Sequence, residues 1–228
     1  MADITAKEAE QLAAQYIEAL KEKLGDKLKM AGIYGSLVRN DFKPSTSDIN
    51  VLIVTSCLDF ELLKNLSSIT GKAKTISRIS TLFLCENEIR RMAELFPIKF
   101  FEIKKNFSLI FGDDLIKDTH EEWSFFRERA RQELLNIQLR LRKALLLGYP
   151  SPTIIRKPLM VFIPHILSLL RILVDMPESK QFDEDDNFLN ALTDIRNTIE
   201  KADLNDLENA YRLIFSNIDS VLNAVEKL

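Results

Sequence analysis

The residues with the clearest chemical potential lie in the segment 32–54. Gly35 and Ser36 form a Gly-Ser pair directly after an apolar segment that we predict to be a strand. Backbone N–H groups at a turn that leads into a helix point towards phosphate groups. Asp48 and Asn50 stand two residues apart at the start of a second predicted strand, where alternate side chains share a face. The spacing therefore predicts phosphate binding at the turn and one metal ion within reach of both Asp48 and Asn50.

This segment resembles the signature of the nucleotidyltransferase superfamily. In that signature Gly-Ser precedes a short helix that often carries Arg-Gly, and Ser-Asp-x-Asp opens the next strand. Two positions differ here, because Asn40 stands where glycine is usual and Asn50 stands where the family has its second aspartate. The residues that match the signature are Gly35, Ser36, Arg39, Ser47 and Asp48.

The resemblance implies nucleotidyl transfer, an in-line displacement at the α-phosphorus of a nucleoside triphosphate, here expected to be ATP. Mg²⁺ ions assist this displacement by stabilising the attacking and leaving oxygens. The acceptor would be a hydroxyl group of a small molecule or of a protein side chain. By resemblance, Asp48 and Asn50 would hold the metal and would be catalytic together with Glu102. The nucleotide would contact Gly35, Ser36, Arg39, Ser47 and Lys99.

The third acidic position of the family has two candidates in this chain. Family members carry it on a later strand, and we predict a strand at 98–104, directly after Pro97. The Pro-x-Glu pattern of the adenylyltransferases places Lys99 at this position, whereas the nearest carboxylate is that of Glu102. Successive side chains alternate across a strand, so Lys99 and Glu102 would face opposite ways and could not replace one another. Both assignments are kept open.

Asn50 retains an oxygen ligand but lacks the charge of an aspartate. A unit charge about 4 Å from a divalent ion is worth roughly 8 kcal/mol at an effective dielectric near 20. We therefore expect impaired two-metal catalysis, which leaves two principal hypotheses. The first is a nucleotidyltransferase that binds ATP with Mg²⁺, and the second is a catalytically inactive nucleotide-sensing or protein-interaction module. A third hypothesis is an antitoxin with a separate ribonuclease partner, as seen for some minimal nucleotidyltransferases.

The composition of the chain indicates in which compartment the protein is expected and which classes of partner are not favoured. The chain of 228 residues has a formal net charge of −3, which gives no reason to expect general nucleic-acid binding. Two cysteines and an N-terminus without an apolar core favour the cytoplasm. The apolar segment 158–174 is interrupted by His165, Ser168 and Arg171, so we expect a buried helix and no membrane span. Burial of that segment in a homodimer is equally compatible with its pattern.

The remaining periodicity predicts an α+β fold with a change of character near residue 119. Residues 1–118 alternate apolar strands and amphipathic helices, as in a mixed sheet covered by helices. Residues 119–228 are helical throughout and predict a four-helix bundle. The expected strands are 27–34, 48–56, 79–85, 98–104 and 107–111. The expected helices are 6–24, 37–40, 58–69, 86–96, 123–147, 154–176, 188–202 and 204–227, with a loop at 177–187.

Overall fold

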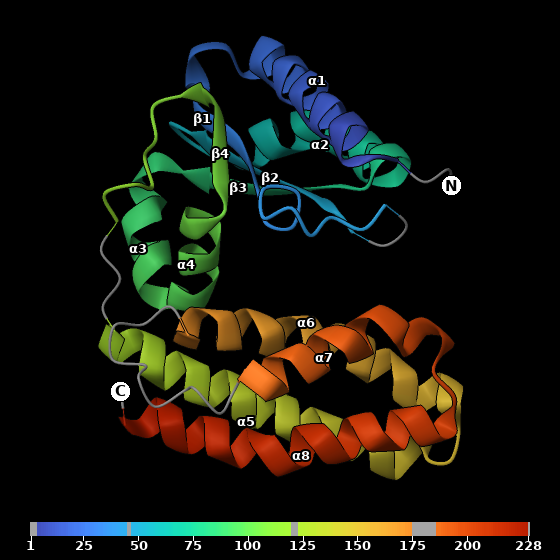
Figure 1. The fold of residues 1–228 in the computed structure, drawn as a ribbon. Coiled ribbons are helices and arrows are strands. Elements are labelled where there is room, and N and C mark those ends of the chain that lie inside the picture. The colour runs from blue at the N-terminus through green and yellow to red at the C-terminus, as the bar shows by residue number, and fades with distance from the viewer. Residues whose placement is uncertain (1–3, 45–46, 120–122, 175–185, 228) are drawn as a thin grey trace. The chain divides into compact units, whose positions relative to one another are not determined.

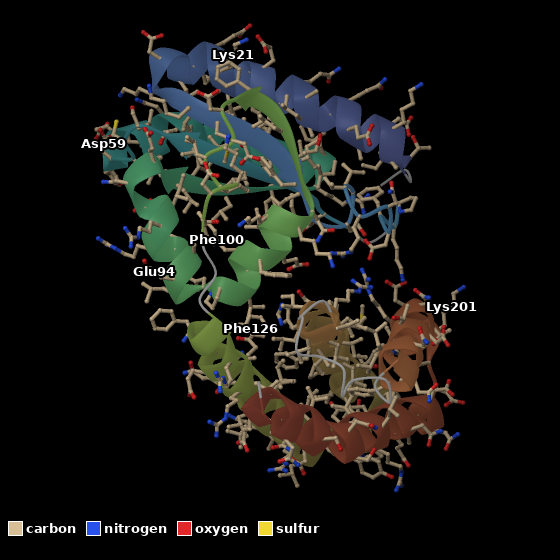
Figure 2. The ribbon with its side chains drawn as sticks, turned by 60° about the vertical axis from the view of Figure 1, so that its left-hand side comes forward. Lys21, Asp59, Glu94, Phe100, Phe126 and Lys201 are labelled. Carbon is tan, nitrogen blue, oxygen red and sulfur yellow. The ribbon has the colours of Figure 1, made fainter. Side chains whose placement is uncertain are left out.

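The computed structural model describes residues 4–44, 47–119, 123–174 and 186–227 (Figure 1). These residues fall into two compact units, Met1–Glu121 and Glu122–Leu228. Figure 2 shows the side chains that each unit carries. The first unit contains the sheet and the second is entirely helical among its described residues, so the chain has the expected α+β fold.

A mixed four-stranded sheet forms the centre of the first unit (Figure 1). Its strands are β1 (Leu28–Tyr34), β2 (Ile49–Thr55), β3 (Ile79–Cys85) and β4 (Phe107–Gly112), in the spatial order β3-β2-β1-β4. β1 pairs antiparallel with both β2 and β4, whereas β2 and β3 are parallel and are joined through a helix. Thus β1 and β2, which flank the Gly-Ser segment, are the two central strands.

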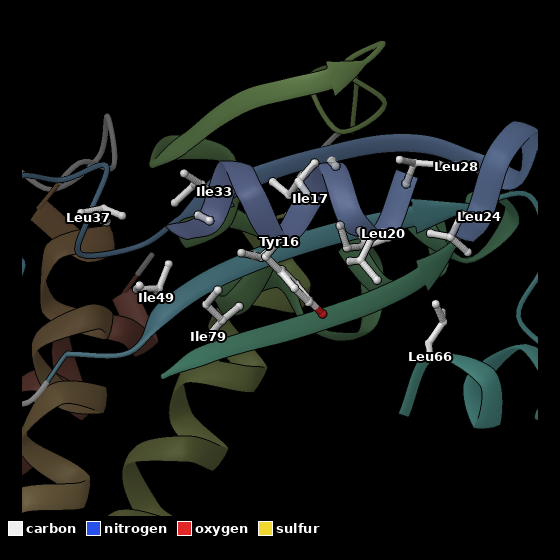
Figure 3. Packing of buried hydrophobic residues seen from close by; sticks show 14 of the residues in the cluster. Tyr16, Ile17, Leu20, Leu24, Leu28, Ile33, Leu37, Ile49, Leu66 and Ile79 are labelled. Atoms are coloured by element: carbon white, nitrogen blue, oxygen red, sulfur yellow. The ribbon is translucent and has the colours of Figure 1, made fainter. Parts of the chain in front are cut away.

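Helices cover both faces of this sheet. Side chains of α1 (Ala6–Leu24) and α2 (Phe60–Ser77) form one core with Ile33, Ile49 and Val51, part of which is drawn in Figure 3. Side chains of α3 (Ile89–Leu95) and α4 (Pro97–Lys105) form the other core, with Tyr34 and Leu52. Short 3₁₀ turns lie at Gly25–Lys27 and Glu86–Glu88. Alternation along β2 therefore directs Asn50 towards the α3–α4 face, between Ile49 and Val51, which face the other way.

The predicted strand at 98–104 is wrong, because the structure has helix α4 there. Pro97 occupies the first turn of α4, where a missing N–H costs nothing, and Lys104 and Lys105 complement the C-terminal end of the helix dipole. Phe100 and Ile103, three residues apart, are buried on one side. The apolar residues of 98–104, which we expected to belong to a strand, therefore follow the spacing of one helix face.

Two further segments near the Gly-Ser turn and β2 differ from the prediction. Residues 37–40, expected to be a short helix, are a series of turns. α2 continues to Ser77 and does not end at Gly71, because Gly71 is exposed and the helix passes it without a break. The extension places Lys74 and Arg78 next to the start of β2, where the N–H of Ile49 donates to the carbonyl oxygen of Arg78 at 3.0 Å.

Among its described residues, the second unit has four long helices that pack as a bundle. They are α5 (Trp123–Gly148), α6 (Pro152–Val174), α7 (Asp186–Thr198) and α8 (Leu204–Lys227), with a 3₁₀ turn at Ile199–Lys201. α5 packs against α6 and α8, and α6 packs against α7. α6 begins at Pro152, so Pro158 and Pro164 both lie inside it. The predicted loop at 177–187 lies almost wholly outside the described residues.

α6 is the one helix among the described residues that is long and apolar enough to cross a membrane. In the unit, 44% of its most apolar window is buried. The buried side chains include Leu159, Ile163 and Leu167, which recur at the spacing of one helix face. These residues place one face of α6 in the core of the bundle.

Gly71→Ala should stabilise the first unit. No atom lies within 4 Å of the position that a Cβ would take at Gly71. Alanine in an exposed helix interior is more stable than glycine by roughly 0.5–1 kcal/mol. Hydrogen exchange of β1 and β2 peptides, followed across a urea series, should show a higher midpoint for the variant. A lower midpoint would contradict the continuation of α2 through this position.

Gly32→Ala should destabilise the same unit. The added Cβ would lie 2.5 Å from the backbone oxygen of Ser108 and against the ring of Phe107, both on β4. Overpacking of this kind costs about 1–3 kcal/mol. The same exchange experiment should show a lower midpoint than the wild type, with Gly71→Ala as the matched glycine control. An unchanged midpoint would argue against the close approach of β4 to β1.

Candidate functional site

The turn after β1 is held in a conformation that suits glycine. Gly35 has φ +85°, in the left-handed region, and its N–H donates to the carbonyl oxygen of Asn106 at 3.0 Å. A Cβ at Gly35 would also lie 3.1 Å from the side-chain nitrogen of Asn50. Gly35 is therefore fixed by the end of α4 on one side and by β2 on the other.

The turn closes on itself through two further backbone bonds. The N–H of Arg39 donates to the carbonyl oxygen of Gly35, and the N–H of Asp41 donates to that of Ser36, each at 3.0 Å. Within the described part of the chain, the N–H groups of Ser36, Leu37 and Val38 donate no hydrogen bond. Successive N–H groups of this kind, next to a left-handed glycine, form an anion-binding concavity.

The backbone conformation of the turn accounts for asparagine at position 40. Asn40 has φ +63°, also in the left-handed region. Asparagine is, after glycine, among the residues that adopt this region most readily. Asn40 can therefore replace the usual glycine of the signature while keeping the same turn.

Asp48 and Asn50 do not share a partner in the structure. The carboxylate of Asp48 accepts a 2.6 Å hydrogen bond from the ammonium group of Lys74, on α2. Asn50 lies beside Gly35 and alternates with the residues that face α2. Asp48 precedes β2 and does not follow its alternation, which is why its side chain can turn towards α2.

Arg39 connects the turn to α4. Its guanidinium group donates to Asp41 Oδ2 at 3.1 Å and to Glu102 Oε1 at 3.3 Å. All three side chains are 23–30% exposed. Arg39 therefore orients Glu102 and offsets the charge of both carboxylates, in addition to its predicted role at a phosphate.

Lys99 and Glu102 lie on the same side of α4, because residues three apart on a helix are neighbours. The ammonium group of Lys99 lies 4.9 Å from the centre of the Tyr34 ring. Burial raises the pKa of Tyr34 to about 12, and the negative charge of Glu102 adds to the effect. The expectation that Lys99 and Glu102 face opposite ways is wrong, since both approach Tyr34 at the end of β1.

Ser47 is occupied by its own loop. Its hydroxyl oxygen accepts a hydrogen bond from the N–H of Lys43, and its N–H donates to the carbonyl oxygen of Lys43, both at 2.9 Å. The side chain is buried. Ser47 thus holds the loop that leads to Asp48, and a direct contact with a nucleotide stays a prediction.

The residues present fit one Mg²⁺ better than two. In the described ranges, no three Asp, Glu, His or Cys side chains gather as ligands of one ion. Mg²⁺ prefers charged oxygen ligands, but Glu102 is engaged by Arg39 and Asn50 offers only a neutral amide oxygen. Asp48 can supply a carboxylate if Lys74 moves, because a partly exposed ion pair is worth only about 0.2–1 kcal/mol. This donor set does not fit a pair of ions.

Three residues of the site were missed by the sequence analysis. Lys74 lies outside every element expected from the sequence, because the helix at 58–69 was expected to stop before Gly71. The carbonyl oxygen of Asn106 accepts the N–H of Gly35. Asn106 follows Lys104 and Lys105, and this sequence is typical of the C-terminal end of a helix, here α4. Tyr34 was treated only as an apolar strand residue, and no pattern in the sequence indicated its contact with Lys99.

Two comparisons with known proteins found matches, one to a protein family and one to a solved structure. The nucleotidyltransferase domain family matches residues 13–108. Among solved structures, the chain is similar to a spectinomycin adenyltransferase from Enterococcus faecialis, crystallised with ATP and spectinomycin. The TM-score is 0.51 at 15% sequence identity, and the match covers 95% of this chain and 99% of the other. No curated protein matches the sequence.

The family match spans β1, the Gly-Ser turn, β2 and the start of β4, and the solved structure shares the fold. The predicted resemblance is thereby confirmed. Residues 13–108 match the nucleotidyltransferase domain family, which supports the resemblance of this chain to the nucleotidyltransferase superfamily.

Proposed function

We propose that the first unit binds ATP at the turn formed by Gly35 and Ser36 and transfers its nucleotidyl group to a hydroxyl acceptor. The observation that carries the proposal is the set of three adjacent N–H groups at Ser36, Leu37 and Val38, which donate no hydrogen bond within the described residues. Phosphate oxygens would accept from these groups and complete the turn. Lys99 adds a nearby positive charge at the end of β1.

Mg²⁺ bound at Asp48 would supply electrostatic stabilisation of the phosphates and of the leaving pyrophosphate. The chain itself would hold the triphosphate at the turn and keep Glu102 oriented through Arg39. Tyr34 is neutral at neutral pH, as an ordinary phenol is, and its ring contacts the ammonium group of Lys99. Burial and the charge of Glu102 raise the pKa of Tyr34 further, to about 12. With one carboxylate available for metal, we expect slow transfer.

A small molecule is the better supported acceptor class. The similar solved structure is an adenyltransferase that was crystallised with ATP and spectinomycin, a small-molecule ligand. A protein hydroxyl is the alternative acceptor.

The second candidate function is nucleotide binding without transfer. The observation that favours it is the 2.6 Å ion pair between Lys74 and Asp48, together with the neutral amide at Asn50. In this function the cation of Lys74 takes the place of a metal charge beside Asp48. The two functions differ in their need for magnesium and in the release of labelled product from [α-³²P]ATP.

ATP should stabilise the protein. At a concentration about 100 times its Kd, a ligand adds about 2.7 kcal/mol of stability, which raises the Tm of a chain of this size by roughly 5–10 °C. Thermal unfolding in Mg²⁺ and in EDTA measures this shift. A shift that needs Mg²⁺, with labelled acceptor formed, supports transfer, and an equal shift in EDTA without product supports the second function. No shift with any nucleoside triphosphate would contradict both.

Ser36→Asp should weaken ATP binding roughly tenfold or more. A carboxylate at the turn would repel the triphosphate, and two like charges about 4 Å apart repel by ~1–4 kcal/mol between the limits of bulk water and a protein surface. In Ser36→Asn the new side chain has nearly the size of aspartate but carries no charge, so this variant should retain most of the affinity for ATP. Isothermal titration calorimetry measures both variants. Equal affinities of the two variants would place the phosphates elsewhere.

Lys74→Met should strengthen the binding of Mg²⁺ to the ATP-bound protein by roughly up to fivefold. The substitution frees the Asp48 carboxylate from an ion pair worth ~0.2–1 kcal/mol. Lys72→Met removes the same charge from an exposed position of α2 and should have no comparable effect. Mn²⁺ titration followed by electron paramagnetic resonance gives the affinities. If both variants behave alike, Asp48 is not the metal ligand.

A further inference from the structure

A cavity lies within the second unit, between the C-terminal end of α5 and the middle of α8. Its volume is about 520 Å³, which is within the range of sites that hold small molecules. Leu145 and Leu146 form an aliphatic wall, and Tyr149, Tyr211 and Phe215 contribute aromatic rings. None of these residues belongs to the nucleotide site described above. The cavity is therefore a separate candidate for ligand binding.

The aromatic residues that line the cavity offer a ligand apolar ring surface and few hydrogen-bonding groups. The hydroxyl of Tyr211 donates to the carbonyl oxygen of Ile155 at 3.0 Å, and the whole Tyr211 side chain is buried, so Phe215 presents the accessible ring of this pair. The rings of Tyr211 and Phe215 lie 5.8 Å apart and are tilted by 58°. The faces of such rings attract cations.

One oxygen of the Glu208 carboxylate, Oε2, accepts no hydrogen bond from the described residues, although it forms an ion pair with Arg212. The other oxygen, Oε1, accepts the hydroxyl of Tyr149 at 3.0 Å, and this bond raises the pKa of the Tyr149 phenol. Oε2 lies 3.6 Å from the guanidinium group of Arg212, which is too far for a hydrogen bond. The Glu208 side chain is 27% exposed, whereas that of Arg212 is 77% exposed. The negative charge thus lies in the cavity, and the positive charge lies mostly in solvent.

We propose that this cavity binds a small organic cation, with an ammonium group on Glu208 Oε2 and an apolar ring system against Phe215 and Leu145. The ammonium would gain a charge-assisted hydrogen bond and contact with the aromatic faces. An anion would have to bind the exposed Arg212 and would approach the charge of Glu208. The proposal does not depend on nucleotide binding in the first unit.

Tryptamine is a suitable probe, because it joins a primary ammonium to an indole ring. Isothermal titration of the full-length protein in phosphate buffer should give a Kd of roughly 0.05–1 mM for a ligand of this size. Tryptophol and indole-3-propionate carry the same ring with a neutral and an anionic group, and each should bind at least about tenfold more weakly. Nα-acetyl-lysine amide, which carries the ammonium without the ring, should also bind more weakly. Tight binding of this last probe would assign the cavity to a protein lysine instead.

Glu208→Gln should lower tryptamine affinity about tenfold, whereas Glu200→Gln, which removes an exposed carboxylate outside the cavity, should not change it. Arg212→Gln should leave the affinity unchanged or increase it, because it removes a competing cation. Circular dichroism confirms that each variant keeps its helices. No tryptamine binding, equal binding of tryptophol, or an unaltered affinity in Glu208→Gln would each overturn the proposal.

Discussion

The left-handed conformation of Gly35 is the constraint on which the candidate site depends. Its N–H is bonded to the carbonyl oxygen of Asn106, and a Cβ at this position would lie only 3.1 Å from the side-chain nitrogen of Asn50. One residue thus joins the end of β1, the start of β2 and the end of α4. Any other residue would strain the backbone and displace Asn50. The N–H groups of the next three residues, which donate no hydrogen bond among the described residues, depend on this corner for their arrangement.

The charges around this corner are already largely compensated within the chain. Asp48 is paired with Lys74, and Glu102 is paired with Arg39. Both pairs are partly exposed, so each contributes little to the stability of the fold and can be broken by a ligand of higher charge. A triphosphate with its counterion is such a ligand. The two pairs therefore describe how the charges of the site are balanced in the absence of nucleotide.

Much of the first unit could be predicted from the sequence, because its strongest patterns are local. α1 has the predicted bounds, since its apolar stripe is regular and Thr5 caps its start. All four strands of the sheet lie within one residue of their predicted ends. The Gly-Ser turn was recognised because glycine at the end of an apolar strand has a specific conformational use.

The errors arose where local signals were ambiguous or where distant residues meet. The segment after Pro97 is rich in phenylalanine and isoleucine, which favour strands, yet the burial of Phe100 with Ile103 fixes a helix. An exposed glycine such as Gly71 costs a helix about 1 kcal/mol, which the packing of Leu62 and Leu66 outweighs. The bond between Lys74 and Asp48 spans 26 residues, and no pattern along the chain reports it.

The most direct test of the account follows the backbone amides of the turn by ¹H–¹⁵N NMR while ATP is added to the full-length protein. The unbonded N–H groups of Ser36, Leu37 and Val38 should show the largest downfield proton shifts, because they acquire phosphate acceptors. The amide of Gly35 should move less, since it is already bonded to Asn106. Saturable shifts that leave these three amides unchanged and appear elsewhere in the chain would contradict the proposed phosphate site.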